Sequence, residues 1–178
     1  MQKQREEGKL QKKYLALAEG DLSEANDSVF WKEIAIPLAP DPENPMKMTI
    51  SPDGLLPGSR NAVTYYKNIK SFGNVTLVEL QLETGRTHQI RVHMAGVGHP
   101  LLGDTMYNPR VCLKMSNSKE KKNTEGRINN RNDCFKRAAL HAWKLIFCHP
   151  FTDEIITLEA PLPADFCRFL NANEEEKT

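Results

Sequence analysis

The decapeptide TGRTHQIRVH, which begins at Thr84, contains the residue types best suited to chemistry in this chain. A strand pattern ends at Thr84, and Thr87 can then cap a helix. The N–H groups at the start of a helix attract anions, and Arg86 and Arg91 add positive charge near the same place. The residues therefore predict an anion or carboxylate site at 84–91. A solvated, ion-paired helix face is the competing interpretation, because such arginines are common.

Four other side chains could transfer protons or attack a substrate. His88 and His93 could act as bases, although histidines on a helix face more often form structural hydrogen bonds. Asp104 follows Gly103, and this pair is more typical of a turn than of a nucleophile. Tyr14 lies in a short apolar run, where spacing alone favours a core strand tyrosine whose hydroxyl reaches the surface. Each of the four therefore has a structural alternative.

Several segments follow, in order, the pattern of one enzyme family. They are Lys13–Gly20, Gly85–His93, Gly98–Asp104 with Tyr107, Leu140–Ala142, Phe147, His149–Pro150 and Ala160–Phe166. The first resembles the tyrosine motif of the RluA-type RNA pseudouridine synthases. The run GRTHQIRVH and the segments after it resemble the closing catalytic motif and the C-terminal signature of that family. The resemblance spans about residues 12–168.

The resemblance implies a fold, an activity and a partner. The fold is α+β, with a mixed, mainly antiparallel sheet flanked by short helices beside an RNA cleft. The activity is the isomerisation of uridine to pseudouridine in rRNA or tRNA, without a cofactor. An aspartate attacks the uridine at the ribose C1′ or at the uracil ring, and the base detaches, turns and rejoins through carbon.

The resemblance also implies residue roles. Arg91 matches the arginine that pairs with the nucleophilic aspartate and keeps it ionised, since an opposite charge nearby lowers the pKa of a carboxylate. Tyr14 matches the aromatic residue that packs on the target base and is a candidate for proton transfer at C5. Ile90 matches the apolar residue that lines the uracil pocket. The other expected substrate-binding residues are Arg86, His88 and Gln89.

The nucleophile of that family lies in an HRLD motif, which does not occur in this sequence. All eight aspartates follow Tyr14, whereas the family's nucleophile precedes the tyrosine motif. The preferred interpretation is a fragment or a truncated gene model. The alternatives are a second polypeptide that supplies the missing half, or an inactive relative that binds RNA or assists ribosome assembly. In each case we expect an unpartnered Arg91, an inactive isolated chain and exposed apolar sheet surface.

Residues 110–137 contain nine Lys/Arg against three acids, a local net charge of +6. Asn and Ser are frequent there and apolar residues are sparse, which predicts a flexible insertion. In an RNA-binding module, this insertion would grip phosphates together with Arg86 and Arg91, and binding would depend strongly on salt. For the insertion itself, a solvated loop without a partner is the preferred interpretation.

Hydrophobic periodicity predicts about six strands and two or three short helices. One helix follows Thr87 and ends at Gly96 and Gly98, and another opens at Pro163. The expected strands are 14–18, a short one near 31–37 in a long loop at 21–62, then 62–66, 75–83, 140–148 and 155–160. The expected division of the chain is an N-terminal arm or helix remnant at 1–13, a domain at 14–170 and a polar tail at 171–178.

Composition excludes several classes of protein. Hydrophobic residues make up 39% and charged residues 26%, as in globular domains, and the net charge of +1 indicates no partner. The four cysteines form no CxxC pair, so we expect reduced, mostly buried thiols in an intracellular protein and no metal site. No membrane-spanning run or secretory signal is expected. The choice among cytoplasm, nucleus and organelle stays open.

Overall fold

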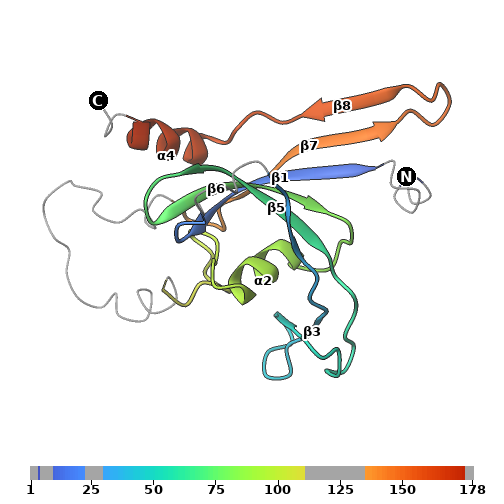
Figure 1. Ribbon diagram of the computed structural model, residues 1–178, viewed down its shortest axis with the longest axis vertical. Coiled ribbons are helices and arrows are strands. Elements are labelled where there is room, and N and C mark those ends of the chain that lie inside the picture. Colours follow the sequence, from blue (N-terminus) through green and yellow to red (C-terminus); the bar gives the residue numbers. More distant parts are fainter. Residues whose placement is uncertain (1–3, 5–9, 23–29, 111–134, 175–178) are drawn as a thin grey trace, which may run out of the picture.

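A computed structural model describes residues 4, 10–22, 30–110 and 135–174 of the chain. In this part of the chain, helices α2 (Gln89–Gly96) and α4 (Ala164–Glu174) lie on opposite sides of a six-stranded sheet (Figure 1). Every strand pairing described is antiparallel, which confirms the expected α+β class. The strands, in spatial order, are β2 (Lys32–Ile34), β5 (Thr64–Ser71), β6 (Val75–Leu82), β1 (Gln11–Glu19), β7 (Leu140–Cys148) and β8 (Ile155–Glu159).

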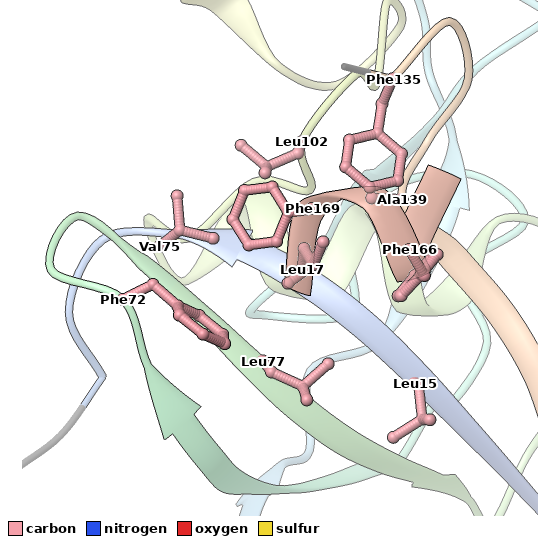
Figure 2. Close-up of a cluster of buried hydrophobic side chains, with 10 residues drawn as sticks. All are labelled: Leu15, Leu17, Phe72, Val75, Leu77, Leu102, Phe135, Ala139, Phe166 and Phe169. Carbon is pink, nitrogen blue, oxygen red and sulfur yellow. The ribbon is translucent and has the colours of Figure 1, made fainter. Parts of the chain in front are cut away.

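Alternating side chains along β1 build a core on both faces of the sheet. Leu15 and Leu17 belong to the cluster on the α4 side, where the two phenylalanines of α4 lie over the strands (Figure 2). Ala16 and Ala18 belong to the cluster on the α2 side. The α4 cluster consists of Leu15, Leu17, Phe72, Val75, Leu77, Leu102, Phe135, Ala139, Phe166 and Phe169. The α2 cluster consists of Ala16, Ala18, Leu22, Ile34, Val78, Leu80, Ile90, Met94 and Leu101. The sheet is thus the middle layer between the two helices.

β6 differs from the half-buried strand predicted at 75–83, because it is buried on both faces as far as Leu80. It lies between β5 and β1 and contributes to both clusters. Its one carboxylate inside the strand, Glu79, is paired with the ammonium groups of Lys13 at 3.0 Å and Lys67 at 2.9 Å. Central position in the sheet, which alternation alone does not reveal, decides the burial of this strand.

The proline-rich segment holds two strands that the sequence did not predict. β3 (Leu38–Pro40) and β4 (Met48–Ile50) form a separate two-stranded sheet. A ladder this short tolerates proline at the end of a strand, where no N–H is needed. The many prolines of this segment therefore argued against strands in the sequence, although two are present. The hairpin packs on α2 so closely that a Cβ added at Gly96 would lie 2.9 Å from Cγ2 of Ile50.

The other strand and helix boundaries either differ from the predicted ones or agree with them. β1 begins at Gln11, so residues 11–13 belong to the sheet and not to the expected arm, because they pair with β7. β5 continues to Ser71, beyond the predicted end at 66. The C-terminal hairpin is confirmed as β7 and β8, and the helix after Pro163 is confirmed as α4.

Several expectations fall partly or wholly outside the described residues. Residues 111–134, most of the basic insertion, lie outside them, as do Cys112 and Cys134. Cys148 is half-buried and Cys167 is exposed, so the expectation of mostly buried thiols is wrong for these two free cysteines. None of the helices described is long and apolar enough to cross a membrane.

The turn at Gly103 requires glycine. Its φ is +66°, and an added Cβ would lie 2.3 Å from the carbonyl oxygen of Arg137 and 2.6 Å from Cβ of Phe135. L-residues rarely adopt this backbone conformation, and here the surrounding backbone also leaves no room. Its neighbour Asp104 is fully buried, so the turn sets the position of a sealed carboxylate.

Replacing Gly103 by alanine should lower the free energy of unfolding by more than about 2 kcal/mol, because backbone strain adds to the clash. Gly54→Ala is the matched control, since Gly54 has a φ of +70° but nothing within 4 Å of an added Cβ. It should show only the strain, about 1 kcal/mol. Urea unfolding of both variants measures the difference. Equal losses would contradict the tight packing around Gly103.

Candidate functional site

The loop between β6 and α2 places the TGRTHQ residues at the end of the sheet. His88 is the N-cap residue of α2 and has a left-handed backbone, with φ of 55°. The prediction that Thr87 caps the helix is therefore wrong. Instead, Oε1 of Gln89 accepts hydrogen bonds from the N–H of Arg86 at 2.9 Å and from the hydroxyl of Thr84 at 2.8 Å. A glutamine inside the helix, and not a threonine before it, closes the loop.

The amide of Gln89 is fully used inside the protein. Its Nε2 donates to the carbonyl of Val63 at 2.9 Å and to the hydroxyl of Thr64 at 3.0 Å, while Oε1 accepts the two bonds from the loop. These bonds use both donors and both lone pairs of the amide. Only 2% of the residue is exposed. The structure therefore gives Gln89 a structural role, while its contact with substrate stays a prediction.

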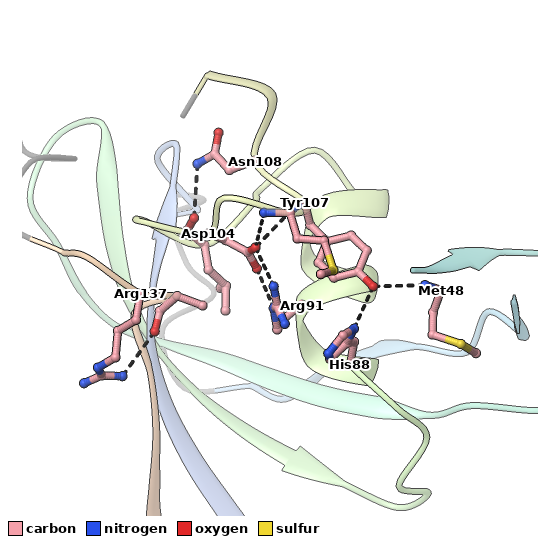
Figure 3. A network of polar contacts seen from close by, with 10 residues as sticks. Met48, His88, Arg91, Asp104, Tyr107, Asn108 and Arg137 are labelled. Carbon is pink, nitrogen blue, oxygen red and sulfur yellow. Dashed lines mark hydrogen bonds and ion pairs between the residues drawn. The ribbon is translucent and has the colours of Figure 1, made fainter. Parts of the chain in front are cut away.

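Arg91 forms a bidentate ion pair with Asp104 (Figure 3). Nε donates to Oδ2 and Nη2 donates to Oδ1, both at 2.7 Å. The Asp104 side chain is 0% exposed and the Arg91 side chain 20% exposed. Oδ1 also accepts from the backbone N–H groups of Met106 at 3.0 Å and Tyr107 at 3.1 Å. The carboxylate is sealed inside the protein, while part of the arginine remains open to solvent.

The electrostatics of this pair favour its charged form. Burial by itself raises the pKa of Asp104, but the hydrogen bonds from Arg91 and from the two backbone N–H groups outweigh burial, so the pKa is lowered. The hydrogen bonds to Asp104 raise the pKa of Arg91 in spite of its partial burial. Asp104 is thus a carboxylate and Arg91 a guanidinium across the ordinary pH range.

The Arg91–Asp104 pair bears on two expectations from the sequence. The expectation that Arg91 lacks an aspartate partner is wrong, because a buried carboxylate from the same chain holds it. The interpretation of Asp104 as a turn former is confirmed by its bonds to the next backbone N–H groups. A carboxylate so fully hydrogen-bonded and buried is also unsuited to attack a substrate. Of the anion site predicted at 84–91, the structure shows one part, the bond from Arg91 to a carboxylate of the same chain.

Tyr107 and His88 extend the network to the β3–β4 hairpin (Figure 3). The guanidinium carbon of Arg91 lies 4.9 Å from the centre of the Tyr107 ring. The Tyr107 oxygen accepts from the N–H of Met48 at 3.0 Å and hydrogen-bonds with Nδ1 of His88 at 2.8 Å. Burial, and then the charge of Arg91, lower the pKa of His88, which is therefore neutral near pH 7. His88 holds Tyr107 in place, and the structural alternative for this histidine is supported.

A pocket of about 220 Å³ joins the tyrosine motif to the TGR segment. Tyr14 and Arg86 both line it, and Nε of Arg86 donates to the carbonyl of Asn61 at 3.0 Å. The lining residues are Leu10, Lys12, Tyr14, Leu82, Thr84, Gly85 and Arg86. Two motifs about seventy residues apart in the sequence thus meet around one hollow.

Two expected site residues do not line this pocket. Ile90 is 4% exposed and belongs to the α2 cluster, against which the half-buried Tyr14 packs. Ile90 is therefore part of the hydrophobic core. Arg91 follows it on α2 and points to Asp104, outside the residues that surround the pocket. The structure therefore unites Tyr14 with Arg86, and places Arg91 in a separate network.

His93 is a buried structural residue. It is 0% exposed, its Nδ1 lies 2.8 Å from the hydroxyl of Thr64, and its Nε2 donates to the carbonyl of Ile36 at 2.9 Å. Burial lowers its pKa in spite of the bond to Ile36. His93 therefore joins α2 to β5 as a neutral side chain, as its structural alternative states.

Sequence reasoning missed a second polar junction, at the end of β1. Glu19 is 4% exposed and accepts from Nδ2 of Asn108 and from Nη1 of Arg110, both at 2.8 Å. Asn108 is itself fully buried. These bonds join β1 to the same loop that holds Asp104. The only signal in the sequence is a carboxylate within an apolar strand, which marks a buried charge but does not name its partner.

No group of three or more His, Cys, Asp and Glu side chains that could hold a metal ion occurs in the described ranges.

Comparison with known proteins tests the resemblance. The family model for RNA pseudouridylate synthase matches residues 1–96, more than half of the 178 residues. The chain belongs to the RNA pseudouridylate synthase family. It is 42% identical over 136 residues to ribosomal large subunit pseudouridine synthase D of Pasteurella multocida, covering 76% of this chain and 38% of that protein. It is 39% identical over 167 residues to the uncharacterized RNA pseudouridine synthase YhcT of Bacillus subtilis, covering 93% and 45%.

The solved structures agree with this RNA pseudouridylate synthase assignment. Human RNA pseudouridylate synthase domain containing 4 superimposes with a TM-score of 0.68 at 26% identity, covering 97% of this chain and 66% of that one. The RluA type expected from the motifs is confirmed. The chain spans less than half the length of the two curated relatives named above.

Acid should destabilise this chain through His93. Its pKa in the folded chain lies below the ordinary value of 6.5. Below pH 6.5, His93 therefore binds a proton more readily in the unfolded chain than in the folded chain. The contribution of His93 to the free energy of unfolding should be fully present above pH 6.5. It should be lost as the pH falls through the folded pKa. Urea unfolding at pH values from 7.5 to about 5 measures the slope.

His93→Gln, whose amide can replace both hydrogen bonds, should make that slope shallower without removing it, because the pKa of His88 is lowered as well. An unchanged slope in this variant would assign the acid sensitivity to other groups.

Proposed function

We propose that the protein that carries this chain isomerises uridine to pseudouridine in rRNA or tRNA, with Tyr14 and Arg91 as its catalytic residues. The observation that carries the proposal is the pocket in which Tyr14 meets Thr84, Gly85 and Arg86. An aromatic ring beside a positive charge suits an unstacked base and its phosphate. Family membership supports the reaction class.

The reaction needs neither an oxidant nor a cofactor. The bond between C1′ and N1 of uridine breaks, a bond between C1′ and C5 forms, C5 loses its proton and N1 gains one. Tyr14 would pack on the uracil and take part in the proton transfer at C5. Arg86, which lines the same pocket, would bind the nucleotide.

The nucleophilic carboxylate would come from outside the described residues. Asp104 is fully buried and accepts four hydrogen bonds, three of them on Oδ1, so it is not placed to attack a substrate. We propose that a carboxylate on another segment, either of the same protein or of a partner polypeptide, approaches the open side of Arg91. The β8 edge supports a covering segment, because Ile155 is 74% exposed, Leu158 54% and the nearby Phe151 90%.

Tyr14→Phe in the natural protein should reduce the rate of pseudouridine formation by about 100-fold or more, because it removes only the hydroxyl that transfers a proton. Tyr66→Phe is the matched control: both tyrosines pair with Leu80 from opposite sides and pack on the α2 cluster. Pseudouridine is measured by chromatography of nucleosides from digested rRNA and tRNA.

Equal activity in the two variants would remove the hydroxyl of Tyr14 from the mechanism. If the wild-type protein bound RNA with strong salt dependence but formed no pseudouridine, the binding-module alternative would replace the enzyme.

A further inference from the structure

The ion pair of Arg91 and Asp104 uses only one side of the guanidinium. A guanidinium has five N–H donors in a planar fork, and Asp104 takes Nε and Nη2. No residue that the structure describes provides a hydrogen-bond acceptor for Nη1. The carboxylate is sealed at 0% exposure, but the arginine side chain is 20% exposed. The pair is therefore closed on the aspartate side and accessible on the arginine side.

The guanidinium of Arg91 is held along one edge by hydrogen bonds and on one face by an aromatic ring. Asp104 fixes the edge through two bonds of 2.7 Å, and the ring of Tyr107 covers the face at 4.9 Å. Tyr107 is held in turn by the N–H of Met48 and by His88. Every group around Arg91 thus has its own support, which is the arrangement expected of a preorganised charge.

Asp104 is also held firmly. Its Oδ1 accepts from two backbone N–H groups, and the turn before it depends on Gly103, where a side chain does not fit. A surface ion pair would let both partners change rotamer, but here the carboxylate has one position. The aspartate can therefore orient the longer and more flexible arginine.

We propose that Asp104 is a positioning residue for the isomerisation: it holds Arg91 so that the free Nη1 edge faces the incoming nucleophilic carboxylate. This inference rests on the proposed function. Tyr107 assists by covering the guanidinium face. In the absence of the clamp, Arg91 would keep its charge but sample several rotamers, and the bound nucleotide would meet a poorly placed nucleophile.

Asp104→Asn in the natural protein tests the proposal, because asparagine keeps the oxygen that accepts from Met106 and Tyr107. We expect kcat for pseudouridine formation to fall by at least tenfold while KM changes less than twofold. Asp165→Asn is the matched control, since it removes another arginine–aspartate pair, with Arg137 at 2.9 Å on the α4 side. This control should retain wild-type kcat.

Chemical rescue separates positioning from a merely structural role. In Arg91→Ala, methylguanidinium should occupy the vacated place beside Asp104, raise activity at least tenfold and raise the melting temperature above that in equal sodium chloride. The double variant Arg91→Ala/Asp104→Asn should show neither effect. If Arg91→Ala does not fold, the kcat and KM of Asp104→Asn decide the question.

Wild-type kcat in Asp104→Asn would overturn the proposal. So would a folded Arg91→Ala that methylguanidinium neither activates nor stabilises, because Asp104 would then not orient a guanidinium. If the wild-type protein forms no pseudouridine, the proposed function fails by itself. The methylguanidinium-induced shift in melting temperature, present in the single variant and absent in the double one, would still support the clamp.

Discussion

A carboxylate without solvent contact is the constraint on which this site depends. Burying a charge is costly unless the charge is paired and hydrogen-bonded, and Asp104 meets that requirement with Arg91 and two backbone N–H groups. The requirement fixes the distance between α2 and the loop after it. Through Tyr107, the same requirement fixes the β3–β4 hairpin, whose Met48 N–H binds the tyrosine oxygen.

The sheet supplies the rest of the positioning. β1 presents Tyr14 toward the α2 cluster, and its last residue, Glu19, binds Asn108 and Arg110 of the loop that contains Asp104. β5 holds the start of α2 through the hydrogen bond between the amide of Gln89 and the hydroxyl of Thr64. Hydrogen bonds from β1 and β5 therefore link the elements that carry the pocket at Tyr14 and the network at Arg91. In the proposed reaction, Tyr14 holds the base while Arg91 controls the attacking carboxylate.

Local patterns in the sequence predicted the turns and helix ends that depend on interactions between residues close in the chain. The turn between β7 and β8, the amphipathic α4 and the glycines that end α2 all follow from spacing and turn chemistry. The motif around Tyr14 and Arg91 identified the family. Patterns of this kind cannot reveal tertiary partners: nothing around Asp104 indicates that a residue thirteen positions earlier holds it, and Gln89 resembles a substrate ligand until its four bonds are seen. Proline masked β3 and β4 for a similar reason, since their pairing depends on packing against α2.

A double-mutant cycle on unfolding tests the central claim most directly. The free energy of unfolding is measured in urea for the wild-type protein, Arg91→Gln, Asp104→Asn and the double variant. If the buried pair holds α2 to the Asp104 turn, the two residues should be coupled by about 1–3 kcal/mol. Losses that add to within about 0.5 kcal/mol would show that the residues act independently, and would contradict the account.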